Sequence, residues 1–136
     1  VLCAGYETCY LLGSIGVSLP LAPVKAYSLH INNCAVASKL KYATLVEASP
    51  HCLITPYEDT SPHSVRVTGL RDLDGFNNIM RKERLSALMD CAKEFVGSDF
   101  DADKDVTAWA GVMGVSPDDF PIVGKLERFD NLYVNI

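Results

Sequence analysis

Short runs of alternating apolar and polar residues follow one another closely along the middle of this chain. Between Lys25 and Ile31, every second residue from Tyr27 onward is large and apolar, which is typical of a strand with one buried face. Three more strand-like runs follow, at residues 42–47, 51–57 and 64–70. Strands that are linked consecutively by short connections pair in an antiparallel manner. The chain therefore has to accommodate a mostly antiparallel sheet.

One long helical pattern follows these strands, from about Ile79 to Val96. Its apolar residues recur on one helical face: Leu85, Leu88, Met89, Ala92, Phe95 and Val96. Asn77 or Asn78 is expected to cap the start of the helix, and Gly97 is expected to end it. This face predicts a helix packed on the sheet, so the fold class is α+β, with a mostly antiparallel sheet and flanking helices.

The two ends of the chain carry shorter patterns. The apolar run Val1–Gly5 predicts a buried strand, and Glu7–Ile15 predicts a helix whose inner side includes Cys9, Leu11, Leu12 and Ile15 and that ends at Gly16. Further strands are expected at residues 106–113, 121–124 and 131–136, and the polar stretch 58–63 is expected to be a hairpin loop.

Composition excludes several classes of function. The formal net charge of −5 argues against nucleic-acid binding, which needs a basic surface. No apolar run reaches the roughly 20 residues of a membrane-spanning helix. The five cysteines form no C-x-x-C pair, so zinc and thioredoxin-like motifs are not indicated. Reduced, mostly buried cysteines in an intracellular protein, cytoplasmic or organellar, are expected instead.

Local motifs identify neither a metal site nor a catalytic centre. The acidic run Ser98–Asp105 lacks the glycine and the glutamate that a calcium loop needs at its sixth and twelfth positions, so no metal is expected. The sequence has no phosphate-binding glycine loop and no G-x-S-x-G motif. A Ser-His-Asp or Cys-His site assembled in three dimensions stays open. The residues alone thus predict an α+β module without a self-contained catalytic motif.

Several segments taken together resemble the FAD-dependent amino-acid oxidoreductases, a family that includes D-amino-acid dehydrogenase and glycine oxidase. Trp109–Gly124 is similar to the family's W-x-G-L-R-P-x-T-P-D-G-x-P-I-I-G stretch, and Pro23–Leu29 is similar to P-V-K-G-Y-S-L. Val1–Thr8 resembles V-V-x-A-G-A-W-S, and Arg71–Phe76 resembles A-E-L-x-G-F. The order and spacing of these segments hold across essentially the whole chain.

The resemblance implies a division of the chain and a cofactor. Residues 1–24 would be a stub of the FAD-binding domain, residues 25–113 the substrate-binding domain, and residues 114–136 the return into the FAD-binding domain. The cofactor implied is FAD, with Ala4 and Gly5 approaching the flavin in the intact protein. The pyrophosphate-binding G-x-G-x-x-G unit lies outside this sequence, so the chain is expected to be an inactive fragment that does not retain FAD.

One departure from the family pattern concerns the substrate. The family's arginine in G-L-R-P binds the substrate carboxylate, and Met113 stands at that position here. The substrate then lacks a carboxylate, or another cation has taken over, or catalysis is lost. Arg71 is the candidate replacement, and Leu53 is expected to project near it. The resemblance leaves the catalytic residues unassigned.

Two readings of the function follow. The first is the substrate-binding portion of an FAD-dependent oxidoreductase that oxidises an amino acid or related amine by hydride transfer to flavin. The alternative is a non-catalytic binding or interaction module that keeps the fold and has lost turnover, which Met113 favours. In either case, strand edges exposed in the fragment can pair with a second copy, so a homodimer is a further expectation.

Overall fold

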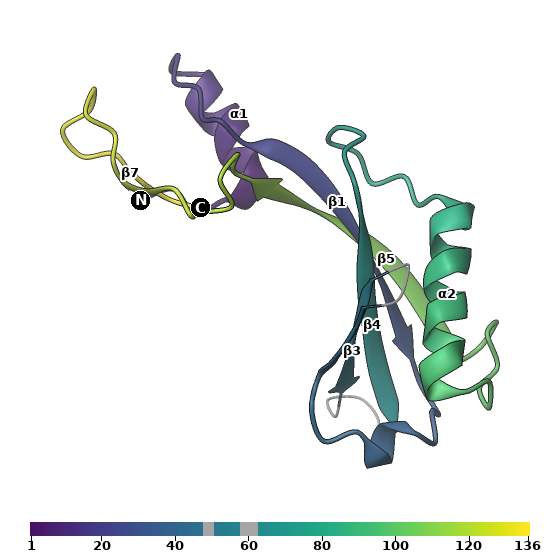
Figure 1. Cartoon of the computed structure of the whole chain (residues 1–136). Helices are drawn as coiled ribbons and strands as arrows, with labels where there is room; N and C mark the ends of the chain where they lie inside the picture. The colour runs from purple at the N-terminus through teal and green to yellow at the C-terminus, as the bar shows by residue number, and fades with distance from the viewer. Residues whose placement is uncertain (48–50, 58–62) are drawn as a thin grey trace. The chain divides into compact units, whose positions relative to one another are not determined.

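The computed structural model describes residues 1–47, 51–57 and 63–136 and contains a five-stranded sheet (Figure 1). Its spatial order is β2-β3-β4-β1-β5. The strands are β1 (Ala22–Ile31), β2 (Thr44–Val46), β3 (Cys52–Tyr57), β4 (Ser64–Asp72) and β5 (Val106–Val115). Strand β3 pairs antiparallel with both β2 and β4. The predicted α+β fold with a mostly antiparallel sheet is confirmed.

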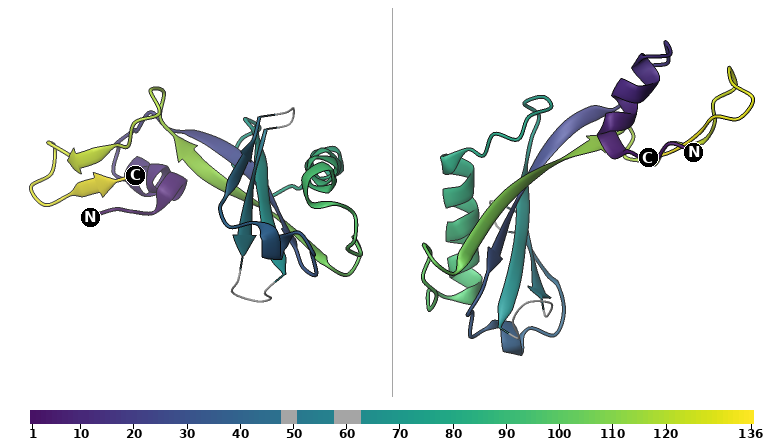
Figure 2. Two further views of the ribbon diagram at one scale, coloured as in Figure 1. Left: turned by 60° about the horizontal axis from the view of Figure 1, so that its bottom comes forward. Right: turned by 180° about the vertical axis from the view of Figure 1, so that it is seen from behind.

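The helix α2 (Lys82–Val96) lies along one face of this sheet (Figures 1 and 2). Its buried residues are Leu88, Cys91, Ala92 and Val96. They join a core to which the strands contribute Tyr27, Leu29, Ile31, Val46, Cys52, Ile54, Val65 and Val67. The predicted apolar face is therefore confirmed in most positions. Phe95 departs from it with 44 % of its surface exposed, and Cys91 takes the buried place instead.

The helix begins later than the sequence indicates. Its first residue is Lys82 and its N-cap residue is Arg81, so the predicted cap at Asn77 or Asn78 is wrong. Asn77 has another role, because its side-chain oxygen accepts a hydrogen bond from Lys25 Nζ at 2.9 Å. The predicted end is correct, since Gly97 is the C-cap and adopts a positive φ of 79°.

The chain divides into two compact units. One consists of residues 1–25, 72–77 and 112–136, and the other of residues 26–71 and 78–111. The second unit contains α2 and most of the five-stranded sheet. The strands β1, β4 and β5 each contribute residues to both units.

The first unit is built from short elements. These are the 3₁₀ helix η1 (Gly5–Glu7), α1 (Thr8–Gly13), and the antiparallel strands β6 (Val123–Lys125) and β7 (Tyr133–Asn135). The two predicted C-terminal strands are thus present, although shorter. Leu2 forms a single parallel bridge to Val134.

Two N-terminal predictions need correction. Val1–Gly5 does not form a buried strand, because beyond the bridge at Leu2 the chain turns into η1 at Gly5, whose φ is +53°. The helix predicted over Glu7–Ile15 is only six residues long. Of its expected inner side, Leu12 is buried, while Leu11 and Ile15 are 50 % and 41 % exposed.

Other predictions have mixed outcomes. The hairpin loop expected at 58–63 falls largely outside the described residues. Within residues 1–47, 51–57 and 63–136, no helix is both long and apolar enough to span a membrane. The five cysteines, all in described segments, form no disulfide; Cys34, Cys52 and Cys91 are buried and Cys3 is exposed.

Candidate functional site

The face of the sheet opposite α2 carries Leu53. Cys52 and Ile54 are buried in the core, so Leu53 between them projects from the other face, where it is 41 % exposed. Its partner across the ladder is Thr68 of β4. We call this surface the open face, and define it by Leu53, Thr68, Arg66 and Ser28.

Arg71 is exposed near the end of β4, where the alternation of the strand is interrupted. Val65 and Val67 point into the core, so Arg71, an even number of residues further on, would by simple alternation also point inward. Leu70, however, adopts a left-handed φ of +60° and packs against the core. This shifts the alternation by one residue, and the next side chain, Arg71, is exposed. The shifted alternation predicts that Arg71 shares a face with Leu53.

Arg66 is a second arginine on the open face, and the sequence does not single it out. Its Nε donates a hydrogen bond to Ser28 Oγ at 3.1 Å. The Ser28 and Thr68 hydroxyls lie 3.1 Å apart. The Arg66 guanidinium also lies over the indole ring of Trp109, with 4.8 Å from Cζ to the ring centroid.

These contacts fix a cation on the open face. Ser28 is only 1 % exposed although it points away from the core, since Arg66 and its neighbours cover it. The bond to Ser28 uses Nε, so it leaves the terminal amino groups of the guanidinium outside that contact. A guanidinium held in this way presents a planar fork that suits a carboxylate.

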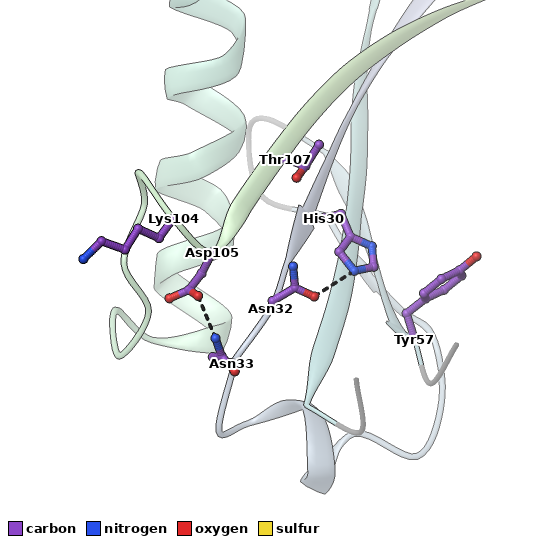
Figure 3. A pocket seen from close by; sticks show the side chains of 7 residues that line it. All are labelled: His30, Asn32, Asn33, Tyr57, Lys104, Asp105 and Thr107. Carbon is purple, nitrogen blue, oxygen red and sulfur yellow. Dashed lines mark hydrogen bonds between the residues drawn. The ribbon is translucent and has the colours of Figure 1, made fainter. Parts of the chain in front are cut away.

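Polar side chains line a pocket of about 700 Å³ at the end of β1 and the start of β5 (Figure 3). The lining residues are His30, Asn32, Asn33, Tyr57, Lys104, Asp105 and Thr107. Asn33 Nδ2 donates to Asp105 Oδ1 at 2.6 Å, and His30 Nε2 lies 3.2 Å from Asn32 Oδ1. The His30 ring also meets the Tyr57 ring edge-on, with 5.3 Å between centroids.

Asp105 supplies the carboxylate of this pocket. The Asp101 N–H and the Asn33 side chain both donate hydrogen bonds to Asp105 and lower the pKa of its carboxyl group. Lys104 points away from the other lining side chains (Figure 3). Its Nζ lies 3.1 Å from Asp101 Oδ2. The pocket therefore offers amide, imidazole and carboxylate groups, and the Lys104 ammonium is paired with Asp101.

Ala4 and Gly5 lie in the first unit, at the start of η1. A Cβ added to Gly5 would meet no heavy atom within 4 Å, so the space above its backbone is open. Ala4 is half-buried, and its N–H donates to Thr8 Oγ1 at 3.2 Å. Small side chains beside open space allow a planar ligand to approach the backbone closely, which fits the cofactor contact expected of these residues.

Met113, the third predicted substrate residue, also belongs to the first unit and is 44 % exposed. Leu53 and Arg71 belong to the second unit. Among the described residues, no group of three or more His, Cys, Asp or Glu side chains is arranged to hold a metal ion.

A buried ion pair in the first unit also has no counterpart in the sequence predictions. Lys25 is fully buried, and its Nζ lies 2.8 Å from Asp74 Oδ2. Asn77 Nδ2 donates to the Asp74 carbonyl at 3.0 Å. The pair therefore ties β1 to the segment that follows β4. The apolar alternation of β1 could have indicated that Lys25, two residues before Tyr27, shares the buried face.

Comparison with known proteins identifies the family to which this chain belongs. The family model described as DAO, FAD dependent oxidoreductase, matches residues 1–136. A D-amino acid dehydrogenase from Methylobacterium radiotolerans is 33 % identical over 131 residues, which is 96 % of this chain and 30 % of that protein.

Solved structures show the same fold. Glycine oxidase from Geobacillus kaustophilus matches with a TM-score of 0.74 at 21 % identity, over 96 % of this chain and 33 % of that one. Glycine oxidase from Bacillus cereus matches with a TM-score of 0.71 at 19 % identity, over 98 % of this chain and 35 % of that one. The chain thus spans about a third of the length of these relatives. It belongs to the FAD-dependent oxidoreductase family.

Proposed function

We propose that this chain is the substrate-binding portion of an FAD-dependent oxidoreductase that oxidises an amino acid or a related amine. The observation that carries the proposal is the family match over all 136 residues, together with a 33 % identical relative named as a D-amino acid dehydrogenase. A non-catalytic module with the same fold is the alternative, and the match to enzymes along the whole chain does not favour it.

In this proposal, the open face contributes substrate contacts from the second unit. Arg71 is exposed and holds a positive charge on the face that also carries Leu53. A substrate carboxylate would accept charge-assisted hydrogen bonds from the Arg71 guanidinium, and the Leu53 side chain would contact apolar parts of the substrate. The shifted alternation at Leu70 supports these roles, because it gives both side chains the same direction.

Met113 stands where the family carries its carboxylate-binding arginine. A thioether has no charge and only a weak acceptor, so it cannot hold a carboxylate. Of the three explanations, we propose that another cation has taken over, since Arg71 is available on the open face. Met113 would then contact an apolar part of the substrate.

FAD is the cofactor that we propose for the full-length protein, with Ala4 and Gly5 against it. When bound, FAD would supply the acceptor for a hydride from the substrate Cα. The open space above Gly5 supports this placement. The 136-residue chain by itself would not retain FAD and would be inactive, because the relatives that it matches are about three times as long.

Substrate kinetics test the assignment of Arg71. In a full-length protein containing this chain, Arg71→Ala should raise the KM for an amino acid by about 10- to 100-fold, the loss expected for a charge-assisted contact. The same variant should leave the KM for the matching amine, which lacks a carboxylate, within about twofold. Arg71→Lys should recover part of the loss. Arg128→Ala, which removes an exposed arginine 3.4 Å from the Gly16 carbonyl, serves as the control.

The outcomes separate the two parts of the proposal. If the full-length protein binds FAD and oxidises amino acids but Arg71→Ala leaves every KM unchanged, Arg71 is not the carboxylate ligand. If a folded full-length protein takes up no FAD and reduces no artificial electron acceptor, the enzyme assignment itself is wrong.

We also propose that the 136-residue chain can self-associate through a sheet edge. In the order β2-β3-β4-β1-β5, the edge strands are β2 and β5. An edge strand presents backbone N–H and C=O groups that a second copy can pair with. Light scattering at increasing concentration should show a dimer, and a monomer at every concentration would contradict this.

A further inference from the structure

Two buried thiols meet at the contact between β3 and α2. Cys52 lies on β3 and Cys91 on α2, 39 residues apart, and their Sγ atoms are 2.6 Å apart. A disulfide bond measures about 2.05 Å. Atoms in ordinary non-bonded contact rest roughly 3.5–4.0 Å apart, even when they are carbons, which are smaller than sulfur. The pair thus lies much closer to bonding distance than to contact distance.

The surroundings hold the two sulfurs in place. Cys52 is 2 % exposed and Cys91 is 6 % exposed, and both belong to the apolar core. Across the ladder from Cys52 is Gly69, where an added Cβ would come within 3.1 Å of Cys52 Cβ and 2.6 Å of the His51 carbonyl oxygen. Glycine at this position therefore leaves the backbone of β3 and β4 close together.

We propose that Cys52 and Cys91 form an intramolecular disulfide when the protein meets a hydroperoxide, which makes the pair a specific oxidation site. In the first step, one thiol sulfur attacks the peroxide O–O bond, giving a sulfenic acid and water (or an alcohol, from an organic hydroperoxide). In the second step, the other sulfur attacks the sulfenic sulfur, the S–S bond forms and a second water leaves. Two thiols are oxidised by two electrons, and one peroxide is reduced.

The position of the pair determines which oxidants act on it. Hydrogen peroxide is small enough to enter a core through local opening, whereas a bulky disulfide such as oxidised glutathione is not. Burial and the hydrogen bond with Cys91 raise the pKa of Cys52 to about 12, so little thiolate is present at neutral pH. Attack by the Cys52 sulfur should therefore be slow at pH 7 and faster as the pH rises toward 9.

The other cysteines provide internal controls. Cys34 is 1 % exposed, and its Sγ lies 3.8 Å from the Val96 carbonyl oxygen rather than beside a thiol. Cys3 is exposed, so it reports general surface oxidation. Neither should join the cross-link.

Mass spectrometry of the 136-residue protein tests the proposal without any variant. After treatment with hydrogen peroxide and blocking of remaining thiols, a non-reducing digest should contain a linked peptide pair that includes Cys52 and Cys91. The intact protein should lose two hydrogens, about 2 Da, and dithiothreitol should restore the mass.

Cysteine variants test which thiols form the cross-link. A protein with Cys3, Cys9 and Cys34 all replaced by serine should lose the same two hydrogens. Cys91→Ala, which keeps a small apolar side chain in the core, should abolish the loss. The proposal is overturned if Cys52 and Cys91 are recovered as separate sulfinic acids, if either links to Cys34, or if both stay reduced while Cys3 is oxidised.

Oxidised glutathione should give the cross-link at least 10-fold more slowly than peroxide at equal concentration, and an equal rate would contradict the buried location.

Discussion

The guanidinium of Arg66 lies over the indole ring of Trp109, 4.8 Å from Cζ to the ring centroid. These two residues come from β4 and β5, and between those strands lies β1, whose Ser28 accepts a hydrogen bond from Arg66 Nε. One side chain thus bridges three strands of the sheet on the open face. Trp109 is the only tryptophan in the sequence, so its fluorescence reports on this arrangement.

Arg66→Ala should uncover the Trp109 ring. We expect a shift of the emission maximum to longer wavelength and a loss of about 0.5–1 kcal/mol in the free energy of unfolding, the range of a partly exposed cation–π contact. Urea denaturation followed by tryptophan fluorescence measures both. Arg71→Ala, on the same face, should leave the emission unchanged, and an equal shift in the two variants would argue against the stacking.

Asp74→Ala should strongly destabilise the protein, because it leaves the fully buried Lys25 ammonium without its carboxylate 2.8 Å away. Removing one partner of a buried pair costs about 3–5 kcal/mol, and the 18 % exposure of the Asp74 side chain points to the lower end of that range. Lys104→Ala disrupts an ion pair whose side chains are 82 % and 44 % exposed, so it should cost less than about 0.5 kcal/mol. Urea denaturation of the two variants makes the comparison, and equal losses would contradict it.

Asn33→Gly should raise the pKa of Asp105. The backbone of Asn33 has a φ of 55°, which glycine adopts without strain, so this substitution removes the side-chain hydrogen bond to Asp105 and leaves the local backbone unchanged. Because hydrogen bonds lower the folded-state pKa of Asp105 below 3.8, its contribution to stability is present above that value and disappears as the pH falls through the folded-state pKa.

A carboxyl titration by nuclear magnetic resonance measures this change directly. The Asp105 midpoint should lie below 3.8 in the parent protein and move upward in Asn33→Gly. It should stay below the ordinary value, since the Asp101 N–H still donates to Asp105 Oδ2 at 2.8 Å. An unchanged midpoint would show that the Asn33 contact does not persist in solution.

Gly69→Ala should destabilise the sheet by about 1–3 kcal/mol, because the new Cβ would lie 2.6 Å from the His51 carbonyl oxygen. Gly13→Ala is the matched control. Gly13 ends α1, and a Cβ there meets no heavy atom within 4 Å, so alanine should stabilise the helix by up to about 1 kcal/mol. Thermal denaturation should therefore move in opposite directions for the two variants, and a shared direction would refute the packing argument.

The pattern of apolar residues predicts the parts of this fold that depend on one element at a time. Alternation places Tyr27, Leu29 and Ile31 on the buried face of β1, and the structure confirms it. Periodicity of 3.6 residues places Leu88 and Ala92 on the buried face of α2. Both patterns are enforced by the burial of apolar surface, which acts along each element independently.

Contacts that join elements distant in the sequence could not be predicted in this way. Arg66 and Ser28 meet because β4 lies beside β1, and the sequence does not specify the strand order. Asparagine is a residue type that often caps helices, but the side-chain oxygen of Asn77 accepts a hydrogen bond from the Lys25 ammonium. Nothing in the sequence indicates that Leu70 adopts a left-handed backbone conformation. The interruption of the strand alternation before Arg71 is therefore found only in the structure.

The division into two units has a consequence for engineering. The chain passes from one unit to the other after residues 25, 71, 77 and 111, so neither unit is a continuous stretch of sequence. A chimaera made with a single crossover would therefore take part of at least one unit from one parent and the rest of that unit from the other. To transplant the open face into a related oxidase, residues 26–71 and 78–111 have to be exchanged together while 72–77 stay with the recipient.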